Sequence, residues 1–158
     1  MKKTAFIGSF ALFVFFTGNA VGQVYEDVNP SDSKEVTYKF SEVAQSPIFP
    51  GCEQYSSEQE RKECFMKSVT TYVAKNFIYP DYARKNKIEG KIFVEFIIDT
   101  DGSVTDIKVV KGVHETLDMA AIEAVRTLNN LEQKIIPAKL EEKPVKFSFV
   151  IPINARIK

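Results

Sequence analysis

Few residues of this chain are of the types that carry chemistry, and their spacing limits what they could do. The one histidine, His114, lies beside Glu115 in an expected loop, and no group of cysteines or further histidines joins it as a metal-ligand set. The run Asp99–Gly102 faintly resembles the start of a calcium loop, but Val110 stands at the twelfth position, where a bidentate Glu is required. The chain has no nucleophile elbow and no phosphate-binding loop. We therefore expect no enzyme activity, no metal and no cofactor.

The first residues have the pattern of an export signal. Lys2 and Lys3 precede an apolar run, Ala5–Phe16, and Ala20-Val21-Gly22 then carries small residues at alternate positions. We predict a signal peptide over residues 1–22, cleaved after Gly22. The alternative is an uncleaved membrane anchor, because residues 4–22 make a stretch of 19 residues, within the roughly 17–25 that a spanning helix needs.

Cys52 and Cys64 are the two cysteines of the chain. Their spacing matches neither a redox motif nor a zinc motif. In the oxidising compartment that an export signal implies, a pair this close is expected to form a structural disulfide. A free pair that carries out thiol–disulfide exchange is the alternative.

The charge of the chain argues against nucleic acid as a partner. Without residues 1–22 the chain keeps 19 basic and 21 acidic residues, a net charge of −2. Nucleic acid requires a concentrated basic face, whereas lysine and glutamate are scattered here. We interpret these charges as an ordinary solvated surface.

Composition divides the rest of the chain into a tether and one domain. Residues 23–46 are polar, and we expect a loose tether with an extended run only near 35–40. Pro47, Pro50 and Gly51 then mark a rigid entry to the folded part. The predicted organisation is a signal peptide or anchor (1–22), a polar tether (23–46) and one domain (47–158).

Two stretches of the domain have the apolar spacing of helices. Ser57 and Glu60 form a capping box, and apolar residues follow at steps of three and four: Phe65, Val69, Tyr72, Val73 and Phe77. Pro80 ends this helix and can open a short helical turn over 81–85. A second helix is expected over about 117–129, with a stripe made of Leu117, Ala121, Ala124, Val125 and Leu128.

The remaining pattern has a period of two and predicts three strands. Residues 91–99 and 104–111 flank Asp101-Gly102, a hairpin turn in which glycine accepts a positive φ. The last strand covers 145–153. A helix between the second and last strands places the last strand beside the first in an all-antiparallel sheet. The predicted fold class is therefore α+β, with two helices packed on one face of a three-stranded antiparallel sheet.

The last strand is the candidate binding element. Pro152 has no N–H for a ladder, so this strand is expected at a sheet edge. An edge strand presents unpaired backbone groups, which can accept an extended peptide as a further strand. The alternative is that Lys146 and Pro152 only protect the edge against aggregation.

Several motifs, taken in order, resemble the C-terminal domain of TonB proteins. The matching segments are Tyr79-Pro80-x-Tyr82-Ala83-Arg84, Ile88–Val94, Asp99-x-Asp101-Gly102-Ser103-Val104, Leu117-Asp118-x-x-Ala121, Lys143-Pro144-Val145 and Ile151-Pro152-Ile153. The resemblance covers residues 47–157, which is nearly all of the chain after the tether.

This resemblance implies a periplasmic domain that binds the short N-terminal box of outer-membrane transporters by strand addition. The expected peptide-binding residues lie in the last strand, 145–153, and in the tyrosine–proline segment before the first strand: Tyr79, Pro80, Val145, Lys146, Phe147, Ser148, Phe149, Val150 and Ile151. In that family, ExbB and ExbD of the inner membrane supply energy for transport, so they are further expected partners.

The resemblance leaves alternatives to a soluble peptide-binding domain. The predicted tether has 24 residues and spans at most about 80 Å when extended, whereas the energy transducers of the family have a long, proline-rich spacer. The chain could still be a short energy transducer anchored in the inner membrane. A structural module that forms a homodimer through the same edge is the alternative from a different class.

Overall fold

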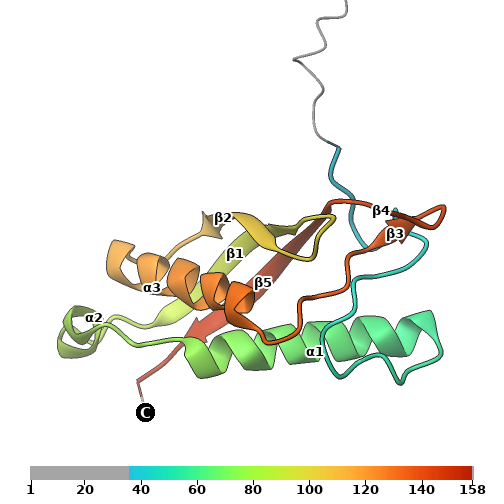
Figure 1. The fold of residues 1–158 in the computed structure, drawn as a ribbon. Helices are drawn as coiled ribbons and strands as arrows, with labels where there is room; N and C mark the ends of the chain where they lie inside the picture. Colours follow the sequence, from blue (N-terminus) through green and yellow to red (C-terminus); the bar gives the residue numbers. More distant parts are fainter. Residues whose placement is uncertain (1–35, 158) are drawn as a thin grey trace, which may run out of the picture. The chain divides into compact units, whose positions relative to one another are not determined.

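A computed structural model of the protein describes residues 36–157. The predicted signal peptide and the first part of the predicted tether lie outside the described residues. The described part forms these elements in order: α1 (Glu58–Asn76), α2 (Asp81–Lys85), β1 (Gly90–Ile98), β2 (Val104–Lys111), α3 (Glu115–Arg126), the 3₁₀ helix η1 (Thr127–Asn130), β3 (Lys139–Leu140), β4 (Lys143–Pro144) and β5 (Phe147–Ala155). Figure 1 shows their arrangement.

Helix α1 begins at the predicted capping box. The Ser57 hydroxyl accepts a hydrogen bond from the backbone N–H of Glu60 at 3.2 Å, and the Glu60 carboxylate accepts one from the N–H of Ser57 at 3.4 Å. Two N–H groups that a helix start would leave unpaired are thereby satisfied. The predicted apolar stripe buries Phe65, Val69 and Val73.

The three-stranded sheet has the order β2-β1-β5 and is antiparallel throughout. The prediction that the last strand lies beside the first is confirmed. Gly102, at φ 80°, closes the hairpin between β1 and β2, where its N–H donates to the Asp99 carbonyl and the Asp99 N–H donates to the Ser103 carbonyl. In β2 the pairing shifts register opposite Glu95–Ile97, and Asp106 nearby has a positive φ of 46°.

Both long helices cover the same face of the sheet. The alternate residues of β1 that face them are fully buried, namely Ile92, Val94, Phe96 and Ile98. Helix α3 contacts β1 and β2, α1 contacts β5, and the two helices contact each other (Figure 1). The small residues Ala121 and Ala124 of α3 are buried there and allow close approach to the strands. The predicted α+β fold class is confirmed.

The structure differs from the predicted tether (23–46) in residues 38–46, which pair with the domain. Tyr38 bridges to Phe147, and further bridges join residues 45 and 48 to residues 139 and 136. The described residues before Pro47 therefore belong to the same compact unit as the domain. The reason is an aromatic contact: the ring of Phe40 packs edge-on against Phe147, with 4.8 Å between ring centroids. This contact holds the segment on the domain, although most of its residues are polar and predicted a loose tether.

The predicted disulfide between Cys52 and Cys64 is confirmed. Cys52 is fully buried in the core, in the loop that precedes α1. Cys64 belongs to the second turn of α1. The bond therefore ties the entry loop to the helix that covers β5.

Candidate functional site

The outer side of β5 is a row of backbone groups. On its inner side β5 pairs with β1 along its whole length, from Phe147 opposite Ile98 to Ala155 opposite Gly90. The N–H of Ser148 points the other way, because it donates to the carbonyl of Tyr38 at 2.8 Å. Backbone groups alternate between the two sides of a strand, so Val150, Pro152 and Asn154 share the outward direction of Ser148.

Pro152 occupies one of these outward positions, where its missing N–H costs the sheet no hydrogen bond. The isolated bridges of the described chain involve Tyr38, Gln45 and Ile48, and none of them reaches β5 beyond Ser148. The side chain of Val150 is 42% exposed. From Val150 to Asn154, therefore, β5 has no strand paired to its outer side within residues 36–157. We call this stretch the open edge.

The first part of β5 is already occupied. The N–H of Tyr38 donates to the Lys146 carbonyl at 2.9 Å, and the Ser148 N–H donates to the Tyr38 carbonyl at 2.8 Å. This is the hydrogen-bond pattern of a parallel strand, and the bridge between Tyr38 and Phe147 is parallel. The chain thus adds a short strand of its own to this edge.

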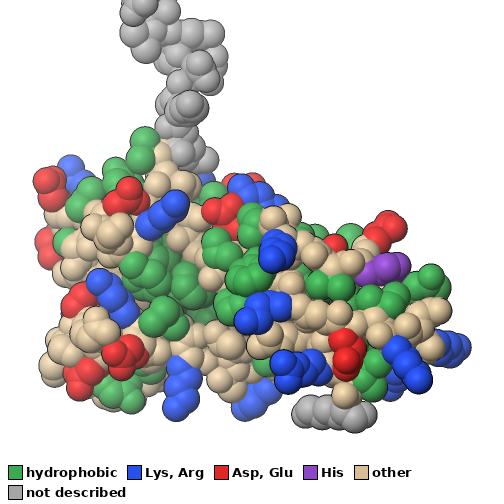
Figure 2. Space-filling view, turned by 180° about the vertical axis from the view of Figure 1, so that it is seen from behind, with side chains coloured by type: hydrophobic (Ala, Val, Ile, Leu, Met, Phe, Trp, Pro, Cys, Tyr) green, Lys and Arg blue, Asp and Glu red, His purple; other side chains and the backbone are tan. Residues whose placement is uncertain are grey.

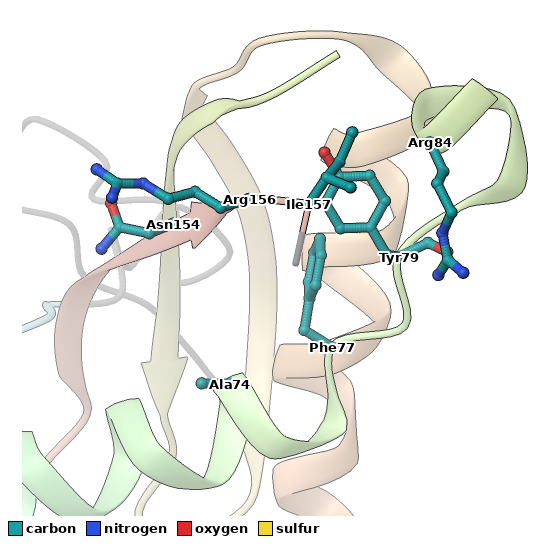
Figure 3. A pocket seen from close by; sticks show the side chains of 7 residues that line it. All are labelled: Ala74, Phe77, Tyr79, Arg84, Asn154, Arg156 and Ile157. Carbon is teal, nitrogen blue, oxygen red and sulfur yellow. The ribbon is translucent and has the colours of Figure 1, made fainter. Parts of the chain in front are cut away.

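A groove runs beside the open edge. A cavity of about 450 Å³ is lined by residues from the end of α1, from the segment leading into α2 and from the end of β5, namely Ala74, Phe77, Tyr79, Arg84, Asn154, Arg156 and Ile157. Figure 3 shows the rings of Phe77 and Tyr79 beside Ile157, with Arg156 and Arg84 on opposite sides of them. A smaller cavity of about 140 Å³ shares three of these residues and adds Thr70, Pro152 and Ile153. We call the two together the edge groove.

Several contacts fix Tyr79 in the wall of the edge groove. Its ring packs edge-on against Phe77, with 6.0 Å between centroids, and the guanidinium of Arg84 lies 5.9 Å from the ring centre. Its hydroxyl donates to the carbonyl of Ile88. Desolvation raises the pKa of Tyr79 above its usual value of 10.0, with a further contribution from the Glu89 carboxylate. The Tyr79 hydroxyl is therefore neutral at physiological pH. The contacts with Phe77, Arg84 and Ile88 hold its ring in one position in the wall of the edge groove.

Ion pairs anchor the other end of β5 to the sheet. The ammonium group of Lys146 lies 2.9 Å from Asp99, and this hydrogen bond is the main cause that lowers the pKa of Asp99. Glu95 accepts hydrogen bonds from Lys108 at 2.8 Å and from the Ser148 hydroxyl at 2.8 Å. These two bonds lower the pKa of Glu95. Both carboxylates are charged at neutral pH and hold the strand in place.

The structure distributes the predicted binding residues unevenly. The side chains of Phe147 and Ile151 are fully buried, and their backbone groups face β1, so neither residue offers a contact on the outer edge. Val145, Lys146 and Ser148 lie at or beside the part of the edge that Tyr38 occupies. Phe149 packs against the ring of Phe40, whereas Val150 lies on the open edge.

Of the tyrosine–proline pair, Tyr79 lies in the wall of the edge groove, while Pro80 is not among its lining residues. Sequence reasoning missed Tyr38, Phe77 and Asn154 as parts of this site. The sequence signal for Tyr38 is its two-residue spacing from Phe40, which is typical of a strand, within a stretch whose other residues are mostly polar. No local pattern marks Asn154, because its role depends on where β5 lies relative to α1.

The surface of the described part also limits other kinds of site. Figure 2 shows hydrophobic side chains gathered near the middle of one face, with lysine and arginine side chains beside them. Residues 36–157 contain no group of three or more His, Cys, Asp or Glu side chains placed to hold a metal ion. None of the helices in this range is long and apolar enough to span a membrane.

The fold and this edge define a small α+β domain whose last strand has an unpaired outer edge from Val150 to Asn154. Residues 75–156 match the family described as Gram-negative bacterial TonB protein C-terminal. The match covers half of the chain, so the chain belongs to this family. The family is one of non-catalytic proteins, and the chain is not an enzyme.

Two curated relatives are both called Protein TonB and come from two strains of Helicobacter pylori. Each is 41% identical over 71 residues, which is 44% of this chain and 25% of the relative. This chain therefore matches about a quarter of the length of these relatives.

Two solution structures of the C-terminal domain of TonB from Helicobacter pylori are also similar. The longer fragment is 33% identical, with 69% of this chain and 87% of that one covered and a TM-score of 0.49. The shorter is 36% identical, with 56% and 91% covered and a TM-score of 0.42.

Proposed function

We propose that this domain binds an extended peptide, of the kind that outer-membrane transporters carry near their N-termini, by adding it as a strand to β5. The peptide pairs with the open edge from Val150 to Asn154, and its alternate side chains enter the edge groove. In this way the domain supports TonB-dependent transport across the outer membrane. The observation that carries the proposal is the outward row of backbone groups on β5 beside a preformed groove.

The chemistry of the edge fits this mode of binding. Main-chain hydrogen bonds give a strand-adding peptide its affinity, and pockets beside the edge select its side chains. The apolar wall of Phe77 and Tyr79 suits an apolar side chain, because each Å² of apolar surface that is removed from water stabilises the complex by about 25 cal/mol. Arg84 and Arg156 lie on either side of this wall.

The proposed location is the periplasm. Residues 1–22 act either as a cleaved signal peptide or as an inner-membrane anchor, and in the anchored form ExbB and ExbD are the proposed partners in the inner membrane. N-terminal sequencing of the protein from cells separates the two forms, since a chain that still begins at Met1 keeps its anchor.

The proposal is tested by titrating the protein with synthetic peptides that copy the N-terminal segments of transporters from the same cell. We expect the backbone amide signals of Val150 and Asn154 to shift on binding. Val150→Pro removes an outward N–H without removing a hydrogen bond to β1, and it should weaken binding at least tenfold. Val150→Ala keeps the N–H and is the matched control. Unchanged signals along β5 at saturating peptide would refute strand addition.

The same titration bears on the alternative of a structural dimer. If two copies pair through β5, the open edge is occupied and the solution mass is that of a dimer that persists on dilution. A monomer whose Val150 signal responds to peptide excludes that alternative.

A further inference from the structure

The segment 38–40 has the geometry of a ligand on β5. Tyr38 makes two backbone hydrogen bonds to the edge, one to Lys146 and one from Ser148, in parallel orientation. An external peptide that added a strand here would use the same two groups. The chain therefore occupies, with its own residues, part of the row that a partner would use.

A single aromatic ring secures this segment. The ring of Phe40 packs edge-on against Phe147, Phe149 and Phe65, with centroid separations of 4.8, 5.7 and 6.0 Å. The ammonium group of Lys62 lies 5.9 Å above the ring. Directly after it the chain turns away, since the N–H of Glu42 donates to the carbonyl of Lys39 at 2.9 Å. This turn ends the pairing before Val150.

The consequence for a partner is a shortage of donors. On the open edge only Val150 and Asn154 supply outward N–H groups, because Pro152 has none. Ser148 would be the third, but its N–H is already given to Tyr38. A partner confined to the open edge thus lacks the donor of Ser148 and the acceptor of Lys146.

We propose that residues 38–40 are an internal strand that competes with the partner peptide for β5 and must be displaced before the full edge can be used. This inference rests on the proposed function, because it concerns the regulation of the same edge. Two backbone hydrogen bonds and one ring hold the internal strand, and it lies at the beginning of the compact unit, so it can open locally while the sheet stays folded. Displacement frees both the edge at Lys146–Ser148 and the aromatic pocket of Phe40.

The first test needs no partner. Phe40→Ala removes the ring and should raise the hydrogen-exchange rate of the Ser148 amide at least tenfold in the full-length protein. The amide of Ile151 faces β1 and should keep its rate, which shows that the sheet remains folded. Ser41→Ala, an exposed position just after the pairing, is the control. An unchanged Ser148 rate in the Phe40 variant would overturn the proposal.

The second test supplies the internal strand from outside. A synthetic peptide that copies residues 35–43 should bind the Phe40→Ala protein and restore the protection of Ser148, whereas it should not bind the wild-type protein. Equal binding to both proteins would overturn the proposal. This result does not depend on any transporter.

The third test measures regulation. The fraction of protein with an open edge scales the apparent affinity, so Phe40→Ala should bind a transporter peptide about tenfold more tightly than wild type. Equal affinities for the two proteins would refute competition and leave the proposed function standing. A transporter peptide that binds neither protein would refute the proposed function, while the outcome of the second test would still decide whether the edge is self-occupied.

Discussion

Ser148 makes hydrogen bonds both to the segment on the outer edge of β5 and to the neighbouring strand β1. Its N–H donates outward to Tyr38, and its hydroxyl donates at 2.8 Å to Glu95 of the neighbouring strand. Glu95 also pairs with Lys108 of β2. A chain of polar contacts thus links all three strands on the face away from the helices.

The Glu95 carboxylate should make stability depend on pH. Its pKa is lowered in the folded protein from 4.5, chiefly by the hydrogen bonds from Lys108 and Ser148. A lowered folded pKa contributes stability above the unfolded value, and this contribution is lost as pH falls through the folded pKa. We therefore expect Glu95→Gln to be less stable than wild type at pH 7 and the gap to narrow below pH 4.5.

Urea midpoints of both proteins between pH 7 and pH 3 measure this effect. Glu132→Gln, on an exposed loop, is the control and should follow wild type throughout. A gap between Glu95→Gln and wild type that stays constant over this range would contradict the assigned contacts.

Two glycines with positive φ should respond differently to alanine. Gly102 has φ 80°, and an added Cβ would lie 2.0 Å from the Ile135 carbonyl oxygen. Gly51 has φ 92° and would meet nothing within 4 Å. A left-handed residue other than glycine costs about 1–2 kcal/mol, so Gly51→Ala should lose about that much free energy of unfolding and Gly102→Ala clearly more. Denaturant titration measures both, and equal losses would mean that the close approach to Ile135 does not matter.

At the scale of elements, the segment around α2 positions Tyr79 beside the end of β5. Pro80 precedes the helix, and the chain leaves it through Lys87 at φ 52°. There the Ile88 N–H donates back to the Ala83 carbonyl at 2.9 Å. This geometry sets the direction of β1 and, through the Tyr79 hydroxyl on Ile88, fixes the wall of the edge groove.

Lys87 is a position where glycine should be better. Left-handed residues that end a helix are usually glycine, which has no Cβ to strain. We expect Lys87→Gly to raise the free energy of unfolding by about 1 kcal/mol and to leave peptide affinity unchanged. Lys85→Gly, within the helix, should instead lower stability by a similar amount. Thermal and urea unfolding measure both, and a destabilised Lys87→Gly would show that its side chain matters more than its φ.

At the scale of the whole molecule, long-range contacts enclose β5 from three sides. β1 pairs with it, α1 packs on it, and the segment 38–48 crosses its beginning before pairing with residues 136–139. The disulfide between Cys52 and Cys64 joins the loop that follows this segment to α1. The residues that follow the internal strand are thus held in place by these pairings and by the disulfide.

Removal of the disulfide should destabilise the fold without abolishing it. Closing a loop of this size stabilises a protein by about 3 kcal/mol on the chain-entropy model, so the paired Cys52→Ala and Cys64→Ala variant should lose about that much free energy of unfolding. Wild-type protein unfolded under reducing conditions is the control and should resemble the variant. Equal urea midpoints for reduced and oxidised wild type would contradict a structural role.

The sequence by itself determined the main helices, the three long strands and their order, because their causes are local, whereas the short strands β3 and β4 were not predicted. A capping box starts α1, the spacing of apolar residues separates helix from strand, and the glycine at 102 allows the hairpin. The topology also followed, since one crossover helix and an antiparallel sheet leave the last strand only one neighbour. Pro152 then marked that strand as an edge.

Only the tertiary structure decided how much of that edge is open. Tyr38 and Phe40 lie more than 100 residues before β5 in the chain, and a polar stretch with two aromatic residues has no local preference for the distant strand. Their position is fixed by the pocket that Phe65, Phe147 and Phe149 form together. The edge groove has the same origin, because it exists only where the end of α1 meets the end of β5. Contacts between residues far apart in sequence create both features, and the pattern of neighbouring residues does not encode them.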